Sequence, residues 1–220
     1  MAAADPPSFA SRDPLSPRFW DERFAKSFTP WDRGGVPQAL RDFVARSPAP
    51  LPTLIPGCGS AYELVFLRQA GWDATAIDFA PQAVARAKAL AGQWGDRVVA
   101  ADFFAWQPPQ ALGFIYECAF LCALPPAMRP QVAARWAELL PPGGQLGGFF
   151  FFDQTVKGPP FGIDRAGLEA LLAPYFDLVE EAAVADSIPV FVGKERWMLW
   201  QRRSSKIGVR SDIRTRPQAR

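Results

Sequence analysis

The sequence predicts an α/β fold in which one mainly parallel sheet lies between two layers of helices. Short, nearly continuous apolar runs alternate with segments that carry apolar residues at helical spacing, a pattern typical of buried parallel strands joined by amphipathic helices. One of these runs ends in a glycine turn, Gly57-Cys58-Gly59, and a helical segment follows it directly. With 220 residues, the chain is long enough to form one such domain with a well-buried core.

Strands and helices are expected to alternate from residue 52 to residue 201. The last two expected strands are separated only by a turn-like segment, 186–193, so we expect them to pair antiparallel at one edge of the sheet. The result is a Rossmann-like, three-layer αβα sandwich with a seven-stranded sheet. The expected strands are 52–56, 73–78, 97–101, 112–117, 144–152, 175–184 and 195–201, and the expected helices are 60–70, 80–93, 127–140 and 164–173.

Two short helices are expected before the sheet begins. Ser16-Pro17 provides an N-cap residue followed by proline in the first turn, which predicts a helix through about Lys26. A glycine-containing break follows, and 37–46 reads as a second helix. We therefore expect a mobile N-terminus at 1–15 and a single domain at 16–201, of which 16–46 forms a helical lid.

The glycine turn belongs to a nucleotide-binding βαβ unit. Asp78 ends the next apolar run, twenty-one positions after Gly57, where a carboxylate can accept hydrogen bonds from ribose hydroxyls. A dinucleotide site needs a further glycine at the position of Tyr62, which argues against a nicotinamide oxidoreductase. Asp102 follows the third strand, where S-adenosylmethionine enzymes place an acid beside the adenine. The unit thus favours S-adenosylmethionine, and the antiparallel last strand fits class I methyltransferases.

Composition excludes several functions. The absence of histidine rules out histidine-based acid–base catalysis and most zinc sites, and we expect no metal. Basic residues are concentrated from Arg202 to Arg220, a tail of net charge +6 that we expect to be disordered, while the rest of the chain carries −4. Because the body of the protein is mildly acidic and lacks an aromatic-basic stripe, we expect no nucleic-acid partner.

The cellular setting is predicted from three further features. Cys58, Cys118 and Cys122 form no CxxC pair and no even disulfide framework, so we expect a reducing, cytoplasmic location. The first residues do not resemble a signal peptide, and the longest apolar run is too short to span a bilayer. We expect a monomer with a small-molecule substrate and no membrane partner.

A resemblance to a known family covers about residues 16–201. Seven motifs carry it, in the order Phe19-Trp20-Asp21-Glu22-Arg23, Thr29-Pro30-Trp31-Asp32-Arg33-Gly34, Pro56-Gly57-Cys58-Gly59, Ile77-Asp78, Ala101-Asp102-Phe103-Phe104, Phe120-Leu121-Cys122-Ala123-Leu124-Pro125-Pro126 and Gly158-Pro159-Pro160-Phe161. Together they resemble the thiopurine S-methyltransferase family, including its thiol and halide methyltransferase branches.

The resemblance implies that the chain binds S-adenosylmethionine and releases S-adenosylhomocysteine. It implies an aromatic N-terminal segment that closes over the cofactor, a glycine contact, a ribose-binding acid, an adenine-flanking pair and a cofactor-lining cysteine. Two departures stand out, because Phe24 replaces a tryptophan of several relatives and Ala61 replaces a second loop glycine. The expected cofactor-binding residues are Trp20, Phe24, Trp31, Gly57, Cys58, Gly59, Asp78, Phe79, Asp102, Phe103 and Cys118.

The expected reaction is methyl transfer to a small soft nucleophile. Thiolate and sulfonium become two neutral species, so a dry site and good positioning favour the reaction, and an acidic thiol needs no histidine. Arg33 and Phe161 are the expected acceptor contacts. No dedicated base is assigned, although Asp32 and Asp153 are carboxylates that could take a proton. The acceptor stays open between a thiol and a halide or a selenium or tellurium compound, and a non-catalytic cofactor-binding module is a further alternative.

Overall fold

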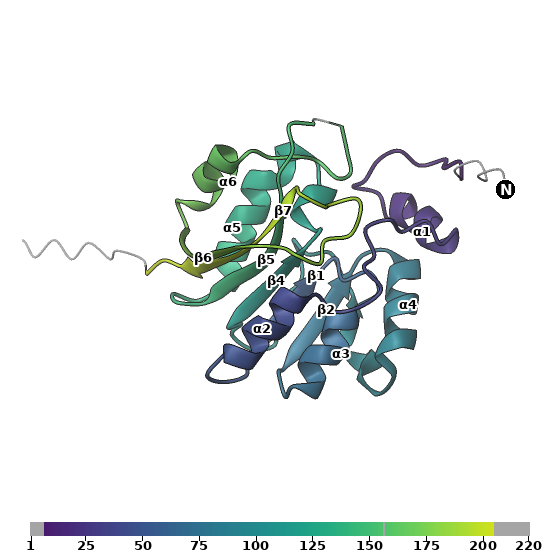
Figure 1. Cartoon of the computed structure of the whole chain (residues 1–220). Helices are drawn as coiled ribbons and strands as arrows, with labels where there is room; N and C mark the ends of the chain where they lie inside the picture. Colours follow the sequence, from purple (N-terminus) through teal and green to yellow (C-terminus); the bar gives the residue numbers. More distant parts are fainter. Residues whose placement is uncertain (1–6, 156, 205–220) are drawn as a thin grey trace, which may run out of the picture.

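The computed structural model describes residues 7–155 and 157–204, and in them a seven-stranded sheet forms the middle layer of an αβα sandwich (Figure 1). The strand order across the sheet is β3-β2-β1-β4-β5-β7-β6. The predicted fold class is therefore confirmed. The strands are β1 (Thr53–Pro56), β2 (Ala74–Asp78), β3 (Val98–Ala100), β4 (Phe114–Cys118), β5 (Gln145–Phe151), β6 (Phe176–Ala183) and β7 (Glu195–Arg202).

The sheet is parallel from β3 to β5 and antiparallel beyond. β1 pairs with β2 on one side and with β4 on the other, and all these pairs run parallel. β7 lies antiparallel between β5 and β6, so the predicted antiparallel pairing of the last two strands is confirmed. β6, rather than the last strand, forms the edge.

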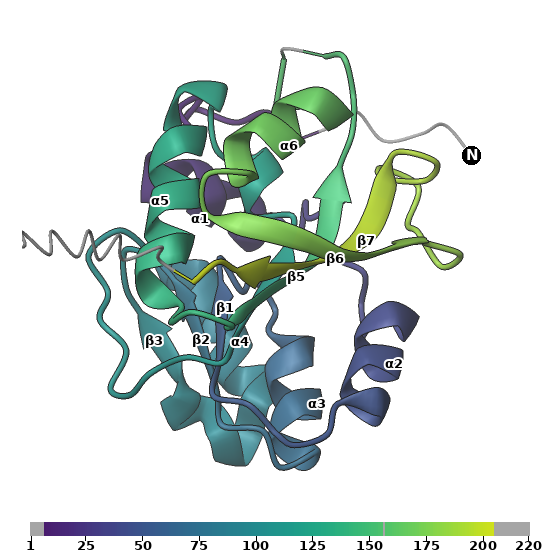
Figure 2. The same ribbon diagram turned by 90° about the vertical axis from the view of Figure 1, so that its left-hand side faces the viewer.

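Helices cover both faces of the sheet (Figures 1 and 2). α2, α3 and α4 pack on one face, and α5 and α6 pack on the other. α1 lies at the end of the sheet beside α4. The helices are α1 (Pro17–Ala25), α2 (Gln38–Arg46), α3 (Tyr62–Gln69), α4 (Pro81–Ala91), α5 (Arg129–Leu139) and α6 (Arg165–Leu172).

Most helix boundaries differ from the expected ones by one or two residues, and two of these shifts have a clear local cause. α4 ends at Ala91 instead of residue 93, because Gly92 takes a φ of +56° and the chain continues as a 3₁₀ turn. α5 begins at Arg129 instead of residue 127, because Pro126–Met128 form a separate 3₁₀ turn. These shifts leave the order of the elements as predicted.

Both ends of the described chain contact neighbouring elements. Residues 7–15 dock on α1, where Oε2 of Glu22 accepts hydrogen bonds from the backbone N–H groups of Ala10 and Ser11, at 2.8 and 3.0 Å. At the other end, Arg202 closes β7 and Arg203 forms an ion pair with Asp177. The rest of the predicted basic tail, 205–220, and residues 1–6 lie outside the described residues.

No helix in the described part of the chain combines the length and the hydropathy that a membrane-crossing segment requires.

Candidate active site

The candidate site lies where the carboxyl ends of β1 and β4 meet. From this point the chain order runs toward β2 on one side and β5 on the other, which makes it the topological switch point where α/β sheets bind ligands. A cavity of about 630 Å³ opens here. Its volume lies within the range of roughly 300–1,000 Å³ that is typical of small-molecule sites.

The glycine loop after β1 forms the floor of the cavity. Gly57 has a φ of +59°, and a Cβ atom at this position would lie 2.7 Å from Cδ2 of Phe120. Only glycine therefore fits between the loop and the segment that follows β4. Ala61, which takes the place of a loop glycine, still adopts the left-handed conformation, with a φ of +55° immediately before α3. This conformation costs an alanine roughly 1 kcal/mol, so the loop keeps its glycine-like shape at a small cost.

Asp78 at the end of β2 points its carboxylate at the glycine loop. Oδ2 accepts a hydrogen bond from the Gly59 N–H at 3.1 Å, and Oδ1 accepts one from the Ala80 N–H at 2.9 Å. Burial raises the pKa of Asp78 above its ordinary value, and the backbone hydrogen bonds oppose this shift. A carboxylate offers about four acceptor positions. Asp78 therefore keeps capacity for two further donors, as a pair of ribose hydroxyls requires.

Asp102 and Phe103 lie at the β3 end of the cavity. Oδ1 of Asp102 accepts a hydrogen bond from the Phe104 N–H at 2.9 Å, which fixes the turn after β3. Phe103 is buried, and its ring meets that of Phe120 edge-on with centroids 4.9 Å apart. Phe79 also lines the cavity. A carboxylate flanked by aromatic rings suits a flat, hydrogen-bonding heterocycle such as adenine.

An aromatic cluster from the N-terminal segment covers the cavity. The ring centroids of Trp20 and Trp31 are 5.4 Å apart, and those of Phe24 and Trp31 are 6.1 Å apart. Phe24 is buried against Ala80 and Ala83, which anchors the cluster to α4. The electron-rich ring faces attract cations such as a sulfonium, and the rings exclude water.

The structure brings all the expected cofactor-binding residues to one cavity. Its wall includes Trp20, Phe24, Trp31, Gly57, Cys58, Gly59, Asp78, Phe79, Asp102, Phe103 and Cys118. Of the residues expected to contact the acceptor or to take a proton, only some line the cavity.

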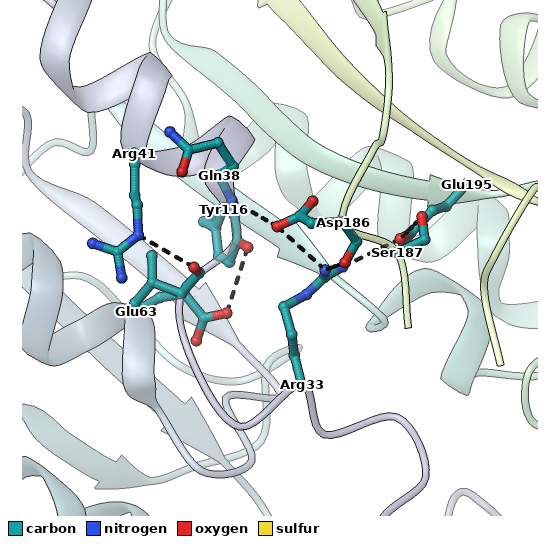
Figure 3. Close-up of polar contacts among 9 residues, drawn as sticks. Arg33, Gln38, Arg41, Glu63, Tyr116, Asp186, Ser187 and Glu195 are labelled. Atoms are coloured by element: carbon teal, nitrogen blue, oxygen red, sulfur yellow. Dashed lines mark hydrogen bonds and ion pairs between the residues drawn. The ribbon is translucent and has the colours of Figure 1, made fainter. Parts of the chain in front are cut away.

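Arg33 lines the cavity, but its guanidinium is already engaged. It donates to the backbone carbonyl of Asp186 and, at 3.2 Å, to Oε1 of Glu195, and Figure 3 shows it extended toward these two residues. Ser187 also donates to Oε1 of Glu195, and the Gln38 N–H donates to Oδ2 of Asp186. Arg33 thus fastens the N-terminal segment to the turn between β6 and β7.

Of the remaining predicted residues, one lines the cavity and two do not. Asp32 lines the cavity, but its carboxylate accepts from the Ser60 hydroxyl and from Arg86. Phe161 and Asp153 are not among the lining residues, and Asp153 pairs with Lys194 at 2.5 Å. Gly158, Pro159 and Pro160, just before Phe161, do line the cavity.

One acidic residue of the described cavity wall, Glu63, was not predicted from the sequence. Glu63, in the first turn of α3, lines the cavity, and burial raises its pKa to about 7. The sequence does contain a signal for it, because an acidic residue in the first turn of the helix that follows a glycine loop can face the ligand. Phe120, which packs on Gly57, was quoted within a motif but not assigned to the site.

The fold is that of class I methyltransferases. The structure resembles that of Burkholderia thailandensis 1,6-didemethyltoxoflavin-N1-methyltransferase, which was solved with S-adenosylhomocysteine bound. The TM-score is 0.70 at 19% identity, and the match covers 93% of this chain and 98% of that one. At this identity the likeness defines the architecture alone.

Sequence relatives define the family. The model of the family described as thiopurine S-methyltransferase matches residues 15–203. Thiocyanate methyltransferase 1 of Arabidopsis thaliana is 30% identical over 190 residues, covering 83% of this chain and 84% of the relative. Thiopurine S-methyltransferase of Pseudomonas fluorescens is 32% identical over 170 residues, covering 68% and 78%. The chain belongs to the thiopurine S-methyltransferase family and is an S-adenosylmethionine-dependent methyltransferase.

Proposed function

We propose that this enzyme transfers the methyl group of S-adenosylmethionine to a small thiol or a similar soft nucleophile. The observation that carries the proposal is the joint placement of the Asp78 carboxylate, the glycine loop and the aromatic cluster around one cavity. The names of the relatives, which refer to thiocyanate and thiopurine methylation, support the choice of a soft acceptor. Three free cysteines support a reducing, cytoplasmic setting, and we propose that the enzyme acts there as a monomer.

The residues present fit the cofactor. Asp78 would hold the ribose hydroxyls, and Asp102 with Phe103 would hold the adenine. Trp20 and Trp31 would cover the sulfonium and keep water out. The cofactor, when bound, supplies a methyl group activated by the positive sulfur.

The acceptor would enter the part of the cavity remote from Asp102. Cys122 and Phe191 line this part and are buried together with Phe151, and Trp31 packs against them. Such an apolar wall disfavours solvation of the thiolate and favours the loss of charge that accompanies transfer. Asp32 and Asp153 are both engaged in ion pairs, so neither is proposed as a base.

Calorimetry followed by an acceptor panel tests the proposal. S-adenosylmethionine and S-adenosylhomocysteine should bind and NAD should not. The panel compares an aromatic thiol, hydrosulfide, a thiopurine, thiocyanate, iodide and selenium and tellurium compounds, with product detected by mass spectrometry. We expect the thiols to react fastest. Preference for iodide or for the selenium or tellurium compounds would reassign the acceptor, cofactor binding without any transfer would indicate a binding module, and NAD binding alone would contradict the proposal.

Trp31→Ala is expected to weaken S-adenosylmethionine binding by about 2- to 30-fold, the equivalent of a cation–π contact of roughly 0.5–2 kcal/mol. S-adenosylhomocysteine lacks the sulfonium charge, so its affinity should fall less. Trp31→Phe, which keeps an aromatic face, is the matched control. Calorimetry with both ligands measures the effect, and an equal loss for the two would show that Trp31 does not face the positive sulfur.

A further inference from the structure

Glu63 is a carboxylic acid at the wall of the cavity. It follows the glycine loop, keeps partial exposure at the cavity wall and has its carboxyl group enclosed by protein. Its hydrogen-bond partner is the Tyr116 hydroxyl, which donates to Oε1 over a long distance of 3.5 Å (Figure 3). Among the described residues, Glu63 forms no ion pair.

Figure 3 shows two cations around Glu63, and both have other partners. Arg41 donates through Nε to the backbone carbonyl of Val36 at 3.3 Å. Arg33 directs its guanidinium to Glu195 and Asp186, as Figure 3 shows. Asp32, on the same segment, adds a negative charge that disfavours ionisation of Glu63, although Asp32 is itself paired with Arg86. The charge of Arg33 lowers the pKa of Glu63, but its guanidinium pairs with Asp186 and Glu195, so the N-terminal segment leaves Glu63 without an ion pair.

The other groups that face Glu63 are neutral at physiological pH. Cys58 of the glycine loop, and Tyr116 and Cys118 of β4, all have pKa values raised by burial. The same cause, burial, raises the pKa of Glu63 to about 7. A carboxyl group enclosed in this way ionises readily only when a cation enters the cavity beside it.

We propose that Glu63 is the counter-ion of the α-ammonium group of bound S-adenosylmethionine. This inference rests on the proposed placement of the adenosine at Asp102 and Asp78. The glycine loop and Glu63 line the same cavity as Asp78 and Asp102, so we place the amino-acid end of the cofactor along the loop, beside the Glu63 carboxyl group. On binding, the Glu63 carboxylic acid becomes a carboxylate and its proton passes to solvent, while the ammonium group keeps its own protons.

Two ligands that differ in the amino-acid part test the inference. S-adenosylhomocysteine carries the ammonium group, whereas 5′-methylthioadenosine has the adenosine and the sulfur without it. Glu63→Gln should weaken binding of the first by roughly 10- to 100-fold, the effect of losing one charged hydrogen bond. It should leave the second unchanged. Glu169→Gln, on the exposed face of α6, is the matched control and should alter neither affinity.

Proton release provides a second readout that needs no variant. Calorimetry at pH 6.5 in two buffers of different ionisation enthalpy should show release of a large fraction of one proton with S-adenosylhomocysteine and none with 5′-methylthioadenosine. Because the free enzyme is protonated at Glu63 below about pH 7, affinity should rise with pH, by up to tenfold per unit, between pH 5.5 and 7. The same comparison excludes Asp78, which serves the ribose of both ligands.

Three results would overturn the inference. Absence of proton release from the wild-type enzyme would do so, and so would an equal loss of affinity for both ligands in Glu63→Gln, which indicates a structural role. Unchanged S-adenosylhomocysteine affinity with loss of methyl transfer would instead place Glu63 beside the acceptor. Failure of the wild-type enzyme to bind either ligand is a distinct outcome, since it refutes the proposed function itself.

Discussion

Asp78→Ala is expected to weaken S-adenosylhomocysteine binding by about 100-fold. The carboxylate has two acceptor positions left after its hydrogen bonds to Gly59 and Ala80, and each charged hydrogen bond to a ribose hydroxyl is worth about 1.5–3 kcal/mol. Losing both costs roughly 3 kcal/mol or more, which corresponds to that factor. Calorimetry measures the loss. Asp78→Asn keeps one carbonyl acceptor and should lose only about tenfold.

The control must separate ribose binding from the integrity of the loop. Asp78 also holds two backbone N–H groups, so the thermal midpoint of each variant is recorded beside its affinity. Asp177→Ala, at an exposed ion pair on β6, should leave the affinity unchanged. Wild-type affinity in a folded Asp78→Ala variant would show that the ribose lies elsewhere.

Glu117→Gln is expected to make the free energy of unfolding less dependent on pH. Glu117 is buried in β4, where Oε1 accepts from the N–H groups of Phe120 and Leu121 and, among the described residues, Oε2 has no partner. Burial raises its pKa from 4.5 to about 8. A raised carboxyl pKa means that the folded state binds more protons, so stability present at low pH is lost as the pH rises from 4.5 to 8.

The expected size of this effect is about 2–3 kcal/mol between pH 6 and pH 8. Glutamine accepts the same two backbone hydrogen bonds and carries no charge, so the variant should gain stability relative to the wild type by that amount at the higher pH. Urea unfolding at the two pH values measures it. Glu63 contributes equally to both proteins and cancels in the comparison. Parallel pH dependences of the two proteins would show that Glu117 does not titrate in this range.

Sequence periodicity was sufficient to predict most of the helices and strands. Buried strands such as β1 and β5 are short apolar runs, and the helices between them carry apolar residues at helical spacing, so local pattern and tertiary burial agree. Asp78 was found because its role depends on its place at a strand end. Local pattern also implied the antiparallel final strand, although it did not reveal that β7 would lie inside the sheet edge.

Contacts between distant segments could not be predicted. Arg33 was interpreted as an acceptor contact, but its partners Asp186 and Glu195 lie 153 and 162 positions away. The burial that raises the pKa of Glu63 depends on β4 and on the N-terminal segment, neither of which is visible in the spacing around Glu63. Phe161 belongs to a loop whose neighbours Pro159 and Pro160 reach the cavity while its own ring does not line it.

The fastening of Arg33 to the β6–β7 turn has a consequence for how the molecule is assembled. The segment that covers the cavity leaves the ribosome well before its anchors, Asp186 and Glu195, which lie 153 and 162 positions after Arg33. Contacts of such long range form late, because most of the chain must be ordered before they are made. Trp20 and Trp31 are therefore synthesised long before the contacts that hold their segment in place can form. The cavity is complete only after β6, β7 and the turn between them have folded.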